Sequence, residues 1–388
     1  MWYFRSPKIV FGDGALAELD QISGKRAFIV TDEVLTSLGF LQLVQDQLAA
    51  VGTDSTFFDR VEADPGLQTV EHCAQAMLAY GPDWIIGLGG GSCLDVAKAA
   101  WFRYERPDIS LEEVSPFEQF DLRSKAGFIT IPTTAGSGAE VTAGAVITDE
   151  RANRKMEVAT YEFTPDLAII DPQFSAQMPP ELTADTGIDV LAHAVEGVAN
   201  TFANDFSDGL CLHAFRMIFE YLPRAYLHGS KDMEARTKMA NAATIAALGL
   251  NNSHVALAHG LGHSAGTEWK ISHGRVTGLF LPYTVEFTAN SGVGHYQALS
   301  RALDLPVDDP IQAGISLAQA IRNLLQKIDM PRSIEQLGIA RLEFEDRLEA
   351  LCDRAEMDSA LATCLRFPYR DDLRKLFEYA YDGWVVDF

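Results

Sequence analysis

The stretch DWIIGLGGGSCLDVAKAA, residues 83–100, joins an apolar strand pattern to a helix pattern through three glycines and a serine. Successive strand and helix patterns of this kind favour a parallel sheet covered by helices. Glycines also let the backbone approach a phosphate closely, and the free N–H groups at a helix start point toward it. The string matches neither G-x-G-x-x-G nor a Walker motif, so a plain tight turn is the alternative interpretation. The candidate phosphate-binding residues are Gly89, Gly90, Gly91 and Ser92.

The first part of the chain repeats this alternation of strand patterns and amphipathic helix patterns. The strand patterns lie at residues 9–12, 26–32, 55–61, 83–90, 127–134 and 166–172. We therefore predict an α/β domain with a parallel sheet over residues 1–178. Residues 144–160 interrupt this alternation of strand and helix patterns, because two short apolar runs flank a charged turn. Such a pattern predicts a β-hairpin.

The second part of the chain shows helical periodicity in place of β-branched runs. Clear amphipathic patterns lie at residues 235–250, 309–328 and 342–355. Pro179 and Pro180, followed by the capping-type Thr183, mark a domain boundary. We therefore predict an all-α domain over residues 179–388.

Composition sets limits on the class of protein. The chain has 388 residues, 47% of them hydrophobic and 22% charged, which is typical of a folded protein with two domains. Its formal net charge of -23 argues against nucleic acid and anionic membrane surfaces as partners. The first residues lack the apolar run of a signal peptide, and a cytoplasmic protein is expected. The five cysteines form no Cys-x-x-Cys pattern, so any metal site must use harder ligands.

A second polar cluster follows a predicted strand at IPTTAGSGAEVT, residues 131–142. Thr133, Thr134 and Ser137 place hydroxyl groups at that strand end. Since α/β sheets bind nucleotides outside the carboxyl ends of their strands, this loop and the glycine turn predict a shared pyrophosphate site, with ligand-free turns as the alternative. Asp32 ends another strand and could bind both ribose hydroxyls, which favours NAD over NADP, or could simply cap a helix.

Histidines crowd into one stretch of the second part. ALAHGLGHSAGTEWKISHG, residues 256–274, holds three of the nine histidines of the chain: His259 and His263, four positions apart, and then His273. Another helix pattern holds Asp189 and His193 with the same spacing, which puts both on one helix face. A buried histidine usually serves packing, but two such pairs and a further histidine favour a metal site.

These motifs together resemble the iron-containing (group III) alcohol dehydrogenases. The resemblance runs from KIVFGDGAL through FIVTD, GLGGGSCLDVAKA, IPTTAGSGAEVT and VITDE to MPPELTADTGIDVLAHAVEG, AHGLGH and ISHG, and it is weakest after about residue 300. It implies four metal ligands, Asp189, His193, His259 and His273, and a nearby non-ligand histidine, His263. It also implies a Rossmann-like dinucleotide site lined by Asp32, the glycine turn, Thr133, Thr134, Ser137 and Lys155, with Asp64, Asp95 and Val146 at its margins.

The resemblance also implies an activity. A divalent metal, with Fe(II) favoured and Zn(II) as the alternative, would polarise the oxygen of a small primary alcohol or aldehyde while hydride passes to or from the nicotinamide. His263 is the proton-relay candidate, since histidine titrates near neutral pH. NAD is expected over NADP, and a homodimer is expected by analogy. Alternatives are a glycerol dehydrogenase-like or dehydroquinate synthase-like enzyme of the same fold, or a non-catalytic metal- or nucleotide-binding protein.

Overall fold

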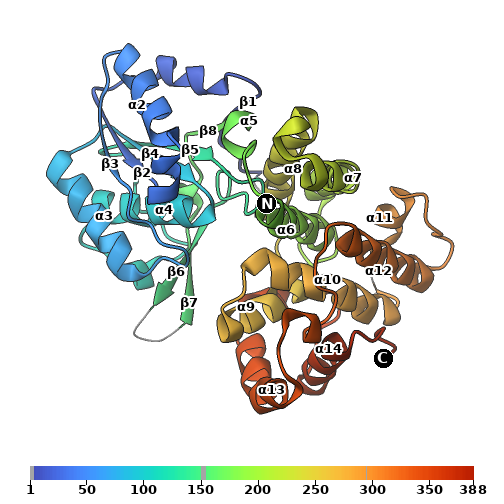
Figure 1. Cartoon of the computed structure of the whole chain (residues 1–388). Coiled ribbons are helices and arrows are strands. Elements are labelled where there is room, and N and C mark those ends of the chain that lie inside the picture. Colours follow the sequence, from blue (N-terminus) through green and yellow to red (C-terminus); the bar gives the residue numbers. More distant parts are fainter. Residues whose placement is uncertain (1–3, 150–153, 294) are drawn as a thin grey trace. The chain divides into compact units, whose positions relative to one another are not determined.

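The computed structural model describes residues 4–149, 154–293 and 295–388. The chain divides into two compact units, Met1–Gln177 and Met178–Phe388. In Figure 1 the first unit runs from blue to green and the second from green to red.

The first unit is built on a parallel sheet, as predicted. Its six strands follow the order β1-β8-β5-β4-β2-β3, and all neighbours pair in parallel. The strands are β1 (Lys8–Phe11), β2 (Arg26–Val30), β3 (Asp54–Phe58), β4 (Trp84–Gly89), β5 (Gly127–Pro132) and β8 (Leu167–Ile170). The helices of this unit are α1 (Glu33–Ser37), α2 (Phe40–Ala50), α3 (Leu67–Tyr80), α4 (Gly91–Glu105) and α5 (Pro172–Ser175).

The central strands are apolar on both faces because helices cover the sheet. Ile85 and Ile86, which point to opposite faces of β4, are both fully buried. Trp101 of α4 stacks on Phe128 of β5, with ring centroids 5.0 Å apart. This packing fixes α4, and with it the glycine turn, against the middle of the sheet.

The predicted hairpin is present as the antiparallel strands β6 (Gly144–Asp149) and β7 (Arg154–Ala159). Two side chains of α4 hold it. Lys98, fully buried, donates from Nζ to the carbonyl oxygens of Thr142 and Gly144 at 2.9 and 2.8 Å. Asp95 accepts a 2.9 Å hydrogen bond from the backbone N–H of Val146. The predicted turn of the hairpin, residues 150–153, lies outside the described residues.

The second unit is helical in its described residues, as predicted. Its helices are α6 (Pro180–Val198), α7 (Asp205–His228), α8 (Met233–Asn251), α9 (Leu257–Trp269), α10 (His273–Asn290), α11 (Gln297–Arg301), α12 (Pro310–Lys327), α13 (Arg341–Glu356) and α14 (Arg370–Asp382). Short 3-10 helices join several of them, including Ser359–Thr363 after α13. Among the described residues, no helix is both long and apolar enough to cross a membrane.

Glycines allow α10 to pack very close to α6 and α9. A Cβ at Gly274 would collide with the carbonyl oxygen of Asp185, and one at Gly278 would lie 2.5 Å from the side chain of Ile188. A Cβ at Gly262 would lie 2.7 Å from the hydroxyl of Thr277. The first two contacts bring the start of α10 against α6, and the third brings it against α9.

Candidate metal centre and dinucleotide site

Helix α6 presents two of the predicted ligands toward the interior of the second unit. Asp189 and His193 lie one turn apart, and each is only 4% exposed. The Nε2 atom of His193 lies 3.8 Å from one carboxylate oxygen of Asp189. The i, i+4 spacing therefore places both side chains together, as the sequence predicts.

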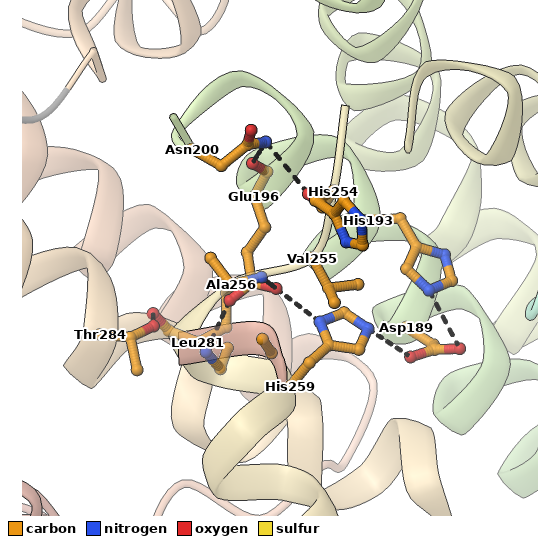
Figure 2. A network of polar contacts seen from close by, with 12 residues as sticks. Asp189, His193, Glu196, Asn200, His254, Val255, Ala256, His259, Leu281 and Thr284 are labelled. Atoms are coloured by element: carbon orange, nitrogen blue, oxygen red, sulfur yellow. Dashed lines mark hydrogen bonds and ion pairs between the residues drawn. The ribbon is translucent and has the colours of Figure 1, made fainter. Parts of the chain in front are cut away.

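Helix α9 brings His259 to the same point (Figure 2). Its Nε2 atom lies 3.9 Å from the second carboxylate oxygen of Asp189, and its ring stacks on that of His193 with centroids 5.1 Å apart. One donor atom from each of these three residues lies within 4.8 Å of the other two. Such a spacing leaves room for one ion among the three donors.

His273 is the first residue of α10, and it reaches the same carboxylate. Its Nε2 atom lies 3.4 Å from Asp189 Oδ1. The side chain of His273 is 44% exposed, whereas those of His193 and His259 are buried. His273 does not belong to the close group of donors formed by Asp189, His193 and His259. His273 therefore occupies the open side of the cluster.

Several buried polar atoms in the cluster have no hydrogen-bond partner among the described residues. They include Asp189 Oδ1 and His259 Nε2, which face each other, and also His193 Nδ1. A buried polar atom without a partner is costly, and a cation between the first two atoms would satisfy both. One carboxylate and several imidazoles suit Fe(II), Zn(II) and other divalent transition metals. The donor set thus fits the predicted metal.

Electrostatics also favours a cation at this point. Burial raises the pKa of Asp189, but the four surrounding histidines outweigh it and lower the pKa overall. Burial lowers the pKa of His193, which favours the neutral imidazole that can bind a metal. Burial also tends to lower the pKa of His259, but the Glu196 carboxylate, together with Asp189 and Asp358, raises that pKa overall.

Glu196 was not predicted from the sequence as a site residue. It lies on α6, seven residues after Asp189 and three after His193, and only 2.5 Å separate its Oε2 atom from Nδ1 of His259. The positions 189, 193 and 196 share one face of the helix, so helical spacing carries the signal that would have found it.

His263 stands beside the cluster, one turn after His259 on α9. Its ring stacks on that of His273, with centroids 5.1 Å apart, and its side chain is 37% exposed. Its Nδ1 atom lies 2.8 Å from a carboxylate oxygen of Asp358, which follows α13. Burial raises the pKa of Asp358, but the hydrogen bond and charge of His263, the hydrogen bond from Ala360 and the charge of His259 together lower that pKa overall. Asp358 is a second residue that sequence reasoning missed, because 95 positions separate the pair.

In the first unit, the two predicted phosphate-binding loops lie against each other. The backbone N–H of Thr133 donates to the carbonyl oxygen of Gly89 at 3.0 Å. A Cβ at Gly90 would lie 3.3 Å from Thr134, and one at Gly91 would lie 3.0 Å from the hydroxyl of Ser137. Gly91 and Ser92 open α4, so the free N–H groups of a helix start lie beside these hydroxyls.

The remaining predicted cofactor residues form two groups. Asp32 caps α1, accepting a 2.8 Å hydrogen bond from Leu35, while its other oxygen lies 3.4 Å from the Cys93 sulfur at the glycine turn. Asp32 therefore caps a helix and also lies beside the glycine turn. On the hairpin, Lys155 pairs with Asp64 at 2.5 Å, and Val146 is bound through its backbone by Asp95.

Tyr283 is a further polar side chain of α10. It is fully buried, and its hydroxyl donates to the carbonyl oxygen of Arg332. Its ring packs in an apolar cluster with residues of α9, α13 and α14. The tyrosine is therefore a core residue, and it does not contribute to the group of metal-ligand candidates.

Comparisons with known proteins agree over both units. A family model described as iron-containing alcohol dehydrogenase matches residues 6–172, and one for the C-terminal part of the Fe-containing alcohol dehydrogenase family matches residues 183–381. An NADPH-dependent butanol dehydrogenase from Clostridium saccharobutylicum is 34% identical, with full coverage of both chains. A bifunctional aldehyde-alcohol dehydrogenase from Escherichia coli is 32% identical over 99% of this chain, which spans 46% of that protein. The iron-containing alcohol dehydrogenase structure from Thermococcus thioreducens superposes with a TM-score of 0.89 at 27% identity, covering 99% of this chain and 100% of the other.

Proposed function

Because the chain belongs to the iron-containing alcohol dehydrogenase family and is a metal-dependent alcohol dehydrogenase, we propose that four side chains of its second unit hold the iron. These are Asp189, His193, His259 and His273. The observation that carries the proposal is a pair of buried atoms, Asp189 Oδ1 and His259 Nε2, that face each other across the cluster and have no hydrogen-bond partner among the described residues. His273 completes the set from the exposed side.

The chemistry needs a metal, a nicotinamide and a path for one proton. A bound iron would supply Lewis-acid polarisation of the oxygen of a small alcohol or aldehyde, and a bound nicotinamide would supply hydride exchange with its carbon. His263 moves the accompanying proton, since it is half-exposed and stacked on His273. Asp358 holds the Nδ1 proton of His263, which leaves Nε2 free to exchange a proton with substrate or water.

The dinucleotide binds to the first unit in this proposal. Gly89, Gly90, Gly91 and Ser92, together with Thr133, Thr134 and Ser137, bind its pyrophosphate. The open backbone at the start of α4 supports this role. Asp32, Asp64, Asp95, Val146 and Lys155 line the rest of the dinucleotide site.

We further propose that NAD is preferred over NADP. The negative charge of Asp32 beside the glycine turn disfavours a 2′-phosphate. One similar protein is named NADPH-dependent, and the structure of a sulfoacetaldehyde reductase of similar fold is a complex with NAD+, so both coenzymes occur among the relatives.

Assembly and location complete the proposal. A homodimer is supported by the position of β1, which forms an outer edge of the sheet and exposes 66% of Phe11. A cytoplasmic location is supported by the five cysteines, all of which are free thiols.

The proposal is tested by anaerobic reconstitution of the metal-free protein with Fe(II) or Zn(II). We expect NADH formation from small primary alcohols with at least one of the metals, and loss of both metal and activity in His259→Ala. The control is His228→Ala, which removes an exposed histidine at the end of α7. Full metal binding by His259→Ala, or no turnover by the native protein over a broad alcohol series, would overturn the assignment.

A further inference from the structure

We propose that Glu196 is a positioning residue for the metal, because its carboxylate fixes the ring of His259 with Nε2 turned toward Asp189. The inference rests on the proposed function in one respect, the role of His259 as a ligand. Glu196 is 4% exposed and lies at the end of α6, where it contacts the first turn of α9 (Figure 2). Among the described residues, the group of close metal donors consists of Asp189, His193 and His259 and does not include Glu196.

Two backbone N–H groups and one imidazole nitrogen converge on this carboxylate. The backbone N–H of Ala256 donates to Oε2 at 2.8 Å, and that of Ala258 donates to Oε1 at 2.5 Å. Nδ1 of His259 lies 2.5 Å from Oε2. Backbone N–H groups can only donate, so the carboxylate is the acceptor in both contacts. Its remaining short contact then requires the proton of His259 on Nδ1.

The position of that proton decides what the other ring nitrogen can do. With Nδ1 protonated, Nε2 carries a free lone pair, and it points at the Asp189 carboxylate 3.9 Å away. A carboxylate behind a histidine also makes the imidazole a stronger ligand. His193 provides the contrast, since its Nδ1 has no hydrogen-bond partner among the described residues. Of the two buried histidines, His259 is thus the one that the protein orients through a carboxylate.

Glu196 also takes the place of a missing helix cap. The N-cap residue of α9 is Ala256, whose side chain cannot accept a hydrogen bond. Glu196 supplies the acceptor from a helix that is 60 positions earlier in the chain. The same carboxylate therefore fixes the first turn of α9 and the ring of the third residue in that turn.

A neighbouring contact holds the end of α6 against the segment that leads into α9. Asn200, just after α6, donates from Nδ2 to the carbonyl oxygen of Glu196 at 2.6 Å and to that of His254 at 3.0 Å. It thereby ties the backbone of Glu196 to the segment that leads into α9 (Figure 2). The carboxylate is held in place independently of any metal.

Charge gives a second reason for this role. Asp189 and Glu196 are the carboxylates in contact with His259, and together they carry two negative charges when ionised. A divalent cation among neutral histidines would balance both. Loss of the Glu196 charge would leave the ion only partly neutralised in a buried site, which lowers its affinity.

The test uses the full-length protein, stripped of metal, with Zn(II) as probe in competition with a chromophoric chelator. We expect Glu196→Gln to bind Zn(II) about 10- to 100-fold more weakly than the native chain. Glutamine has the same length, but its amide NH2 would face one of the three donors. The d–d spectrum of bound Co(II) should also shift, since the orientation of one ligand changes.

The matched control is Glu286→Gln, which removes a buried carboxylate of α10 that is paired with Arg322. We expect it to lower thermal stability while leaving Zn(II) affinity within about threefold of the native value. If Glu286→Gln weakens Zn(II) as much as Glu196→Gln, the effect is general loosening and the inference is wrong. Equal affinity in Glu196→Gln and the native chain also overturns it. No Zn(II) binding by the native chain would instead contradict the proposed function.

A measurement on the native chain covers the case in which Glu196→Gln does not fold. Nitrogen-15 NMR of labelled histidines in the Zn(II)-loaded protein reports which ring nitrogen carries a proton. His259, assigned by its absence in His259→Gln, should show a slowly exchanging proton on Nδ1. A proton on Nε2, or rapid exchange of the Nδ1 proton with water, would contradict the role of Glu196.

Discussion

His263 and Asp358 lie 95 positions apart in the chain, and yet the ring Nδ1 of one and a carboxylate oxygen of the other are only 2.8 Å apart. Asp358 is itself fixed, because its second oxygen accepts a 2.9 Å hydrogen bond from the backbone N–H of Ala360. The pair therefore has a defined orientation beside the candidate metal ligands. A histidine held in this way suits proton transfer.

His263→Gln should slow the reaction without emptying the metal site. We expect kcat to fall on the order of 100-fold, the usual scale of general acid–base catalysis, with bound metal per protein unchanged. Metal analysis and steady-state kinetics on the same sample check both parts. Loss of the metal together with activity would make His263 a ligand and contradict the assignment.

Asp358→Asn should reproduce part of that effect. Asparagine keeps an acceptor for Ala360 but removes the charge that stabilises a protonated His263, so we expect kcat to fall about 10-fold. The double variant with His263→Gln should be no slower than His263→Gln alone, because the two residues act as a unit. If the two losses in kcat multiply in the double variant, Asp358 does not act through His263.

Asp32→Asn should weaken the discrimination against NADP. Asparagine retains the cap of α1, since it can accept from Leu35, and it removes only the negative charge. We expect the ratio of kcat/KM for NADP to that for NAD to rise about 10-fold, with little change in thermal stability. Glu33→Gln, which removes the exposed acid next in the chain, is the control and should leave the ratio unaltered.

Gly274→Ala should disturb the position of His273. The added Cβ would collide with the carbonyl oxygen of Asp185, so the start of α10 has to move away from α6. We expect a loss of about 1 to 3 kcal/mol in the free energy of unfolding, together with weaker metal binding. Gly209→Ala on α7 meets open space and should be neutral or slightly stabilising. Chemical denaturation and metal titration distinguish the two variants.

Asp95 should make the stability of the protein depend on pH in an unusual direction. Burial raises the pKa of Asp95 to about 6, although Lys98 nearby opposes the shift. Between about pH 6 and pH 4 the folded chain therefore binds more protons than the unfolded chain, and this contribution to stability grows as the pH falls. Relative to Asp95→Asn, the native chain should gain about 1 to 2 kcal/mol between pH 7 and pH 4 in urea unfolding. A constant difference between the two proteins over this range would show that the carboxyl has an ordinary pKa.

The strands of the first unit could be predicted because each is a short apolar run ended by turn residues. The pairing order of the strands could not be read from those runs, since it depends on how the helices pack. Lys98 illustrates the limit. In the sequence it is one polar residue of a helix pattern, but in the structure it is fully buried. Burial lowers its pKa to about 8, and the carbonyl oxygens of Thr142 and Gly144 accept hydrogen bonds from its Nζ.

The candidate metal cluster could also be predicted only in part from the sequence. The i, i+4 spacing predicted that Asp189 and His193 share one helix face, and likewise His259 and His263. Which helices face each other depends on small residues such as Gly274 and Gly278, whose effect requires the packed structure. Glu196 was overlooked although it lies on the predicted face, and Asp358 offered no spacing signal because it comes from a distant loop.

Every candidate metal donor belongs to the second unit, and every candidate dinucleotide contact belongs to the first. Substitutions that alter the choice of coenzyme and substitutions that alter the choice of metal therefore fall in different halves of the chain. Natural selection could change one preference without revising the residues that set the other. Chimeric chains that exchange whole units between relatives should inherit the coenzyme preference from one parent and the metal preference from the other.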